Sequence, residues 1–307
     1  MSQPLAIRRY VVIVHSLKSG SYPTLSQLCS RLQQRDLDVS ERTIQRDLEN
    51  LRHTFGMAIA YDASRKGYFL NVEESVNLDS TEAFLEVAET ADILKQSLSK
   101  EREVFQAVSL EHDGALKGID NLPLILKAIF NKHYILFRHT SFQSGKSLPY
   151  QVNPRLLKQY KGRWYIFGQL AGKDLHLSFG LDRIENLKTG DAVSPEDIRL
   201  AKAVNPLNHF KHAIGITTSV GEPEEIILSF TPEQGQYIKA LPLHHSQQIL
   251  EDNPQELRIR LYLIKNFELR QTLLMQGSMV RVIKPLTLQK ELQEIYQKAL
   301  SNYKYPD

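Results

Sequence analysis

The chain has 307 residues, of which 42% are hydrophobic and 24% are charged, and its formal net charge is +3. This length predicts two to three domains, and the composition is typical of a soluble globular protein with sizeable cores. A single cysteine, Cys29, excludes an internal disulfide and a cysteine-based zinc site, and it fits a reducing cytoplasm.

The N-terminus does not read as a signal peptide. Arg8 and Arg9 precede the apolar run 10–14, but His15 and Lys18 soon interrupt it. The run is too short for the hydrophobic region of a secretory signal, and no stretch approaches the length of a membrane span. We therefore expect a cytoplasmic protein with no membrane association.

Positive charge is concentrated at one end of the chain. Residues 1–70 carry ten Lys and Arg against six Asp and Glu, an excess of four, whereas the remainder carries 28 against 29. A polyanion could bind at this end, although such an excess of charge more often belongs to an ordinary solvent-exposed face.

Two amphipathic helices open the chain. Apolar residues at helical spacing predict the first over 6–17, ended by Gly20, which can adopt a positive φ. Thr24 is placed as the N-cap of the second, in which Cys29 lies on the apolar face and is expected to be a small core residue.

The third predicted helix begins after Ser40, a good N-cap. Ile44, Leu48 and Leu51 form its apolar stripe, and an Arg-, Gln- and Thr-rich face lies opposite. Such a face suits the major groove, since Arg can contact guanine bidentately and Gln can contact adenine in the same way. An ordinary amphipathic helix with a charged outer face is the alternative, and it is the better one for this segment taken alone.

The following segment favours the DNA-contact interpretation. Two short strands flank a turn at 62–66, with Arg65 and Lys66 at its tip. Three helices followed by a basic hairpin predict a winged helix-turn-helix, whose third helix enters the major groove while the wing touches the backbone or minor groove. The predicted DNA-contact residues are Ser40, Arg42, Thr43, Gln45, Arg46, Arg52, Arg65, Lys66 and Tyr68.

The motif SERTIQRDLENLR, with GYFL after the hairpin turn, resembles the N-terminal domain of bacterial regulators of the DeoR-like winged-helix type. The matching positions are Ser40, Arg42, Thr43, Arg46, Asp47 and Leu48. Phosphates repel a carboxylate, so we expect Asp47 to pair with a basic neighbour instead of contacting DNA.

Residues 79–112 read as a helical connector between a DNA-binding and a sensing part. A short helix follows at 124–132. Then come β-like segments at 133–140, 148–157, 162–170 and 175–187, separated by Gly-containing turns. Short strands with tight turns predict a small antiparallel sheet or barrel.

The segment GRWYIFG, 162–168, holds the only tryptophan of the chain. Neighbouring strand residues point to opposite faces, so Trp164 and Tyr165 cannot both fill the core. One is core, and the other faces the opposite side, where a base could stack. Packing of both against neighbouring elements is the alternative.

GRWYIFG, followed by FGLDRI and preceded by VNPRLLKQY, resembles the WYL domain, an Sm/SH3-like barrel of bacterial transcriptional regulators. The resemblance implies ligand sensing, with a nucleic acid or nucleotide as effector in several members. The predicted ligand-contact residues are Arg138, His139, Lys158, Arg163, Trp164, Tyr165 and Arg183. Arg183 could alternatively pair with Asp182 or a backbone carbonyl. Many members have a basic residue shortly before the Phe of FGLDRI, where this chain has Leu177 and Ser178, so a strongly anionic ligand would need other contacts.

Residues 224–304 predict the order βαββαβα, an α+β layer. PLHHSQ and NFELRQTLLMQG resemble segments of the WCX extension that follows WYL domains, which implies dimerisation and a cover for the ligand pocket. His244 and His245 are adjacent and would point to opposite faces if extended, which makes them a poor metal pair.

The sequence thus predicts an α+β multidomain chain. Its expected parts are a winged helix-turn-helix at 1–72, a helical connector at 73–122, a WYL barrel at 123–200 and a WCX domain at 201–307. Phosphate-loop, dinucleotide-binding, zinc-protease and nucleophile-elbow motifs are absent from the sequence. We therefore expect no enzyme activity, no cofactor and no metal.

The expected function is that of a homodimeric, effector-responsive repressor that binds double-stranded operator DNA. Two alternatives remain. One is an accessory module that senses single-stranded nucleic acid and regulates a nuclease or defence system. The other is a hydrolase hidden in the barrel, which would involve His139, Asp182 or His244.

Overall fold

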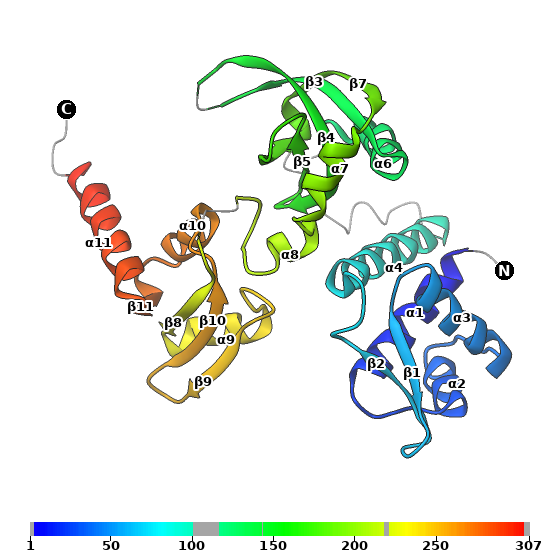
Figure 1. Cartoon of the computed structure of the whole chain (residues 1–307). Helices are drawn as coiled ribbons and strands as arrows, with labels where there is room; N and C mark the ends of the chain where they lie inside the picture. Colours follow the sequence, from blue (N-terminus) through cyan, green and yellow to red (C-terminus); the bar gives the residue numbers. More distant parts are fainter. Residues whose placement is uncertain (1–2, 101–116, 143, 218–220, 304–307) are drawn as a thin grey trace. The chain divides into compact units, whose positions relative to one another are not determined.

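The computed structural model describes residues 3–100, 117–142, 144–217 and 221–303, which form two compact units, 1–111 and 112–307. Helices and antiparallel sheets alternate through both units (Figure 1). None of the described helices combines the length and the apolar character that a membrane crossing requires.

The first unit contains four described helices and one hairpin. Their bounds are α1 Gln3–Lys18, α2 Leu25–Gln33, α3 Glu41–His53, β1 Ala58–Asp62, β2 Gly67–Asn71 and α4 Leu78–Lys100. The two predicted N-caps are confirmed, since the Thr24 side chain accepts a hydrogen bond from Gln27 N and the Ser40 side chain accepts one from Thr43 N. Residues 101–112 of the predicted connector helix lie outside the described residues.

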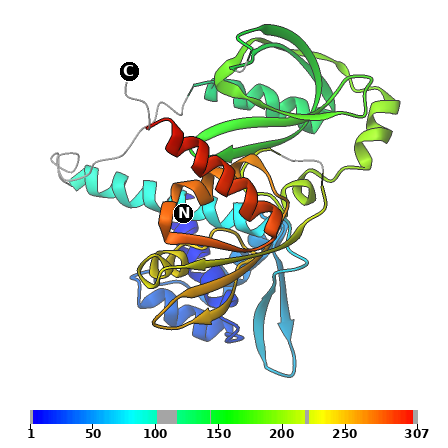
Figure 2. The same ribbon diagram turned by 90° about the vertical axis from the view of Figure 1, so that its left-hand side faces the viewer.

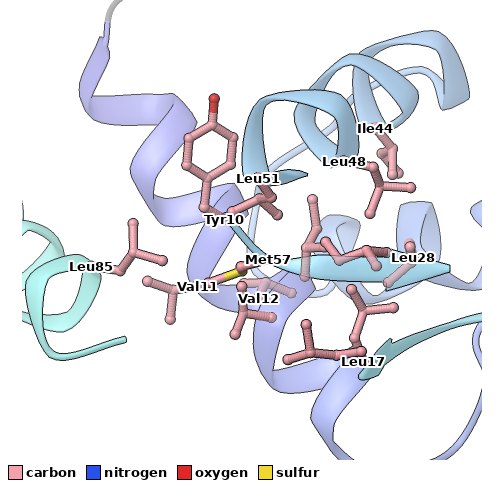
Figure 3. Packing of buried hydrophobic residues seen from close by; sticks show 14 of the residues in the cluster. Tyr10, Val11, Val12, Leu17, Leu28, Ile44, Leu48, Leu51, Met57 and Leu85 are labelled. Atoms are coloured by element: carbon pink, nitrogen blue, oxygen red, sulfur yellow. The ribbon is translucent and has the colours of Figure 1, made fainter. Parts of the chain in front are cut away.

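One apolar core holds the first unit together. Figure 3 shows side chains of α1, α3 and α4 converging on it, among them Val11, Leu51 and Leu85. Leu85 of α4 is only 1% exposed, so α4 packs as part of this unit. Burying such side chains stabilises the fold by about 1.5–3 kcal/mol each.

A buried ion pair also links α1 to α3. Arg9 and Asp47 are 3% and 0% exposed, and two hydrogen bonds join their side chains. The prediction that Asp47 pairs with a basic residue is confirmed.

The second unit begins with a helix and a five-stranded sheet. The bounds are η1 Ile119–Asn121, α6 Leu122–Asn131, β3 His133–Thr140, β4 Ser147–Tyr160, β5 Arg163–Leu170, β6 His176–Gly180, η2 Leu181–Arg183 and β7 Ile184–Ala192. The strands are antiparallel in the order β6-β5-β4-β3-β7. The last predicted β segment, 175–187, is interrupted by the turn η2.

Helix α6 packs against one face of this sheet, as Figures 1 and 2 both show. Ile125 of α6 lies in one cluster with Ile135, Val152 and Ile166, which are each fully buried on that face. We call it the core face, and we call the opposite side of the sheet the outer face.

The chain enters this sheet unit through a close backbone contact. Gly118 has φ +81°, and a Cβ there would lie 2.4 Å from the carbonyl oxygen of Leu181 in η2. Only glycine fits this conformation and this approach without strain.

Two short helices follow, α7 Pro195–Lys202 and α8 Pro206–Phe210. The remaining elements are β8 Glu224–Phe230, α9 Pro232–Ala240, β9 Gln248–Asp252, β10 Leu257–Leu263, α10 Phe267–Met275, η3 Gly277–Met279, β11 Val280–Lys284 and α11 Leu286–Ser301. They confirm the predicted βαββαβα order, and the strands pair as β11-β8-β10-β9. Ile238, Leu269 and Leu288 bring all three helices into one cluster with the alternating apolar residues of β8 and β10.

Candidate functional site

Helix α3 has one buried apolar face and one exposed polar face. Ile44, Leu48 and Leu51 are at most 1% exposed, whereas Arg42 and Gln45 are exposed. Arg46 is also exposed, so the three side chains best suited to base edges are available to solvent. This is the arrangement that an amphipathic period with a buried stripe produces.

The other predicted DNA-contact residues of α3 have structural partners. Ser40 Oγ caps the helix and lies 3.2 Å from Thr43 Oγ1. Arg52 is half-buried, and its Nε donates to the carbonyl oxygen of Ile59 at 2.8 Å. Arg52 therefore ties α3 to β1, and its contact with DNA stays a prediction.

The hairpin tip is stiffened by local contacts. Asp62 Oδ1 accepts hydrogen bonds from Ser64 N, Ser64 Oγ and Arg65 N, which lower the pKa of that carboxyl. The Arg65 guanidinium lies 4.2 Å from the Tyr22 ring centroid, and Lys66 is exposed with φ +54°. Tyr68 packs edge-on against Tyr61 across the two strands.

A recess of about 510 Å³ also opens on this unit. Its lining residues are Val12, His15, Ser16, Ser19, Arg31, Gln34 and Arg35. They gather around the C-terminal ends of α1 and α2, where the helix dipoles disfavour an anion despite the two arginines.

In the second unit the strand β5 separates the two aromatic residues of GRWYIFG. Trp164 packs with Ile166 against the core cluster. Tyr165 lies between them in sequence and so points to the outer face. The open question of which ring faces away from the core is thereby answered in favour of Tyr165.

Tyr165 has an unusual pair of neighbours in the sheet. It pairs with Lys158 on β4 and with Gly180 on β6. A Cβ on Gly180 would lie 2.5 Å from Asp182 Oδ1 and 2.8 Å from Arg183 Nη2. The side chains of Asp182 and Arg183 therefore occupy the space beside Tyr165 that a residue at 180 would fill.

Asp182 lies between two guanidinium groups without a good hydrogen bond to either. Its Oδ2 is 3.7 Å from Arg163 Nη1, and its Oδ1 is 3.6 Å from Arg183 Nε. Both distances exceed the range of hydrogen bonds. Asp182 Oδ1 and Arg183 Nε are buried atoms with no hydrogen-bond partner among the described residues.

His139 lies on β3 in alternation with Ile135 and Phe137, so its side chain points to the core face. Its ring packs edge-on against Phe179 and Tyr150, and its buried Nε2 has no hydrogen-bond partner in the described part of the chain. Burial lowers the pKa of His139, the positive charge of Arg183 lowers it further, and Asp182 opposes them. The imidazole is therefore neutral near pH 7 and can accept or donate one hydrogen bond.

The other end of the outer face is covered by α8. Phe167 lies 4.7 Å from the His209 ring and 5.1 Å from the Phe210 ring. Lys158 Nζ lies 4.8 Å from the Phe210 ring, and burial lowers the pKa of that amine. Lys158 thus sits between α8 and Tyr165.

The predicted ligand residues divide into three groups. Arg163, Tyr165 and Arg183 lie beside or in η2, and Lys158 pairs with Tyr165 on the same face. His139 points to the core face, where its ring packs against Phe179. Trp164 belongs to the core face. Arg138 is exposed, and its Nη2 donates to the carbonyl oxygen of Ser147 in the neighbouring strand.

Sequence reasoning missed Glu268, a carboxylate of α10. It is 4% exposed, and its Oε1 accepts hydrogen bonds from Thr217 N at 3.2 Å and Thr217 Oγ1 at 2.8 Å. At the second position of a helix a glutamate reads as a favourable charge for the dipole, so the sequence offered no signal of its contact with a distant loop.

His244 and His245 do not follow the predicted extended geometry. They precede β9, and their ring centroids are 3.9 Å apart. Burial and the positive charges of His245, His212 and Lys158 lower the pKa of His244 to about 4.

Two family models match the chain. The WYL domain model matches residues 120–189, and the WCX domain model matches residues 222–300. These matches cover the five-stranded sheet with α6 and the C-terminal layer, as the resemblances of their motifs predict.

Among solved structures, the chain is similar to proteasome accessory factor B/C (PafBC) of Arthrobacter aurescens. The match has 18% identity and a TM-score of 0.29, and it covers 87% of this chain and 44% of that one. It is also similar to a CRISPR Cas-related protein, with 14% identity, a TM-score of 0.41, and coverage of 97% and 83%. This chain thus spans less than half the length of the PafBC chain. No curated protein matches the sequence.

Proposed function

Since the chain contains a WYL domain followed by a WCX domain, we propose that it is an effector-responsive, DNA-binding transcription regulator. In this proposal the first unit is a winged helix-turn-helix that binds double-stranded operator DNA. The WYL domain binds a nucleic-acid or nucleotide-like effector. The protein acts in the cytoplasm as a homodimeric repressor without enzyme activity.

One observation carries the proposal for the first unit. Arg42, Gln45 and Arg46 are exposed together on α3, whose opposite face is buried in the core of the unit. A helix held in this way can enter the major groove with its polar face toward base edges. The hairpin tip adds Arg65 and Lys66, which are suited to backbone phosphates.

The effector site is supported by the polar atoms around Tyr165. Buried polar groups are nearly always hydrogen-bonded, so Asp182 Oδ1 and Arg183 Nε, which lack partners among the described residues beside the half-buried Tyr165, favour a site for a polar ligand. Arg163 and Arg183 supply donors for a phosphate, and the Tyr165 ring supplies a surface on which a base can stack. Asp182 offsets one of the two positive charges, which favours a ligand of modest negative charge.

A mobility-shift experiment tests the proposal. Full-length protein is mixed with a duplex from the region upstream of its own gene and with a scrambled duplex of equal length. We expect preferential binding to the first, loss of that preference in the Arg42→Ala/Arg46→Ala variant, and a change in affinity when single-stranded oligonucleotide is added.

The alternative function gives a different result in the same experiment. An accessory module that senses single strands would prefer single-stranded nucleic acid over either duplex. The Arg42→Ala/Arg46→Ala variant would then bind as the parent protein does.

A further inference from the structure

Among the described residues, hydrogen bonds reach only one oxygen of the Glu268 carboxylate. Its Oε1 accepts hydrogen bonds from Ile216 N, Thr217 N and Thr217 Oγ1. Its Oε2 is buried and has no partner among the residues that the structure describes. A buried charged acceptor without a partner costs free energy, and a ligand that donates a hydrogen bond to Oε2 would remove that cost.

The position of the carboxylate is fixed by its surroundings. Gly215 has φ +82°, and a Cβ there would lie 2.5 Å from Glu268 Cγ. Asn266, the N-cap of α10, donates from its side-chain nitrogen to the carbonyl oxygens of Ile214 and Thr217. The loop 214–217 therefore clamps Glu268, which is preorganised rather than free to turn toward solvent.

The same loop brings Glu268 to the outer face of the WYL sheet. Ser178 Oγ donates to the carbonyl oxygen of Ile216 at 3.1 Å. Ser178 pairs with Phe167, so its side chain lies on the face that carries Tyr165. Burial is the main cause that raises the pKa of Tyr160 and Tyr165, and the negative charge of Glu268 adds to both shifts.

We propose that Glu268 Oε2 accepts a hydrogen bond from a nucleobase of the effector, so that the WCX domain reads the base that stacks on Tyr165. This inference rests on the proposed effector class and adds the group that is recognised. A carboxylate repels phosphate and accepts only from N–H or O–H donors. In this arrangement Arg163 and Arg183, next to Tyr165, bind the phosphates of the effector, and Glu268 binds the edge of the base.

The test measures binding of full-length protein to labelled ten-residue oligo(dC) and to an abasic deoxyribose oligomer of the same length and charge. Fluorescence anisotropy reports both, and unlabelled dCMP serves as competitor to separate a free nucleotide from a strand. The oligomers lack the 2′-hydroxyl, so the base is the donor that differs between them. We expect oligo(dC) to bind more tightly than the abasic oligomer.

Glu268→Gln is expected to weaken oligo(dC) binding roughly 10- to 100-fold, as loss of a hydrogen bond to a charged group does, and to leave the abasic oligomer unaffected. Glu233→Gln is the matched control. It makes the same change at an exposed glutamate in the first turn of α9, so the preference for bases should persist. Thermal unfolding of each variant shows whether it is folded.

Equal binding of the two oligomers by the parent protein overturns the inference without use of any variant. So does an equal loss for both oligomers in Glu268→Gln. If neither oligomer nor dCMP binds, the effector class fails together with the inference. Duplex binding in the same buffer then shows whether the DNA-binding part of the proposed function survives.

Discussion

Arg9 and Asp47 lie 38 residues apart in the sequence and meet through two hydrogen bonds, Nε to Oδ2 at 2.5 Å and Nη2 to Oδ1 at 3.0 Å. Both side chains are buried, so the pair joins α1 to the back of α3 inside the first unit. The hydrogen bond from Arg9 to Asp47 outweighs burial and raises the pKa of the guanidinium. The pair therefore sets the position of the helix whose exposed face carries Arg42 and Arg46.

Removing one partner of this pair should destabilise the first unit strongly. Asp47→Ala leaves a buried guanidinium without a counter-charge, and we expect a loss of about 3–5 kcal/mol in the free energy of unfolding. The double variant Arg9→Met/Asp47→Leu removes both charges and should recover most of that loss. Urea unfolding measures both, and a double variant as unstable as Asp47→Ala would show that packing, not charge, is at issue.

Arg46→Ala should weaken binding to the cognate duplex by about 1–3 kcal/mol if Arg46 contacts a base edge. Arg35→Ala is the control, since it removes the same charge from an exposed site on the same unit. Anisotropy titration compares the two variants. Equal losses would mean that Arg46 contributes only general electrostatic attraction.

Arg65→Ala should change the salt dependence of duplex binding. Each phosphate contact contributes about −0.9 to the slope of log K against log of salt concentration, so one lost contact flattens the slope by about that amount per subunit bound. Titrations at several salt concentrations measure the slope. An unchanged slope would indicate that Arg65, which stacks on Tyr22, is a structural part of the hairpin.

Tyr165 and Trp164 should respond differently to replacement by leucine. Tyr165→Leu removes the outer-face ring and should cost about 1–3 kcal/mol in single-strand binding, the usual contribution of a stacked base. Trp164→Leu removes packing from the core face and should lower stability with little effect on affinity at temperatures where the protein is folded. The reverse pattern would place the ligand on the other face.

Most elements could be predicted from local patterns, because each signal acts within a few residues. The N-caps Thr24 and Ser40 and the amphipathic period of α3 are of this kind. The alternation rule separated Trp164 from Tyr165 but could not say which one faces the core. That choice depends on α6 covering one side of the sheet, a contact between segments distant in sequence.

The site was predicted less completely than the fold. The basic residues around Tyr165 were named from the motif, whereas Glu268 was not, because its role depends on loop 214–217 lying over β6. Arg52 was named as a DNA-contact residue, but its Nε donates to the Ile59 carbonyl oxygen. Nothing in the sequence distinguishes such an arginine from one that faces solvent.

Stability should fall as the pH drops from about 6.5 to about 4, and His244 contributes to this fall. Its folded-state pKa of about 4 lies below the ordinary value near 6.5, so the unfolded state binds more protons in that window. The contribution is present above pH 6.5 and is lost as the pH falls. Partial exposure should keep it below about 3 kcal/mol.

His244→Asn provides the comparison for this prediction. Asparagine can still accept the hydrogen bond that Ser246 N donates to His244 Nδ1, but it does not titrate. Denaturant unfolding at pH 4.5 and pH 7 should show a smaller difference in the variant, while the histidines that do not interact with His244 contribute equally to both proteins. The same pH difference in both would assign the effect to those other groups.

The contact of Gly118 with Leu181 joins the segment that precedes α6 to η2, the turn that carries Asp182 and Arg183. A methyl group at position 118 would meet the carbonyl oxygen of Leu181, so either the backbone at 118 or η2 would have to shift. A shift of η2 would move Asp182 and Arg183 with it, although the substitution touches neither side chain.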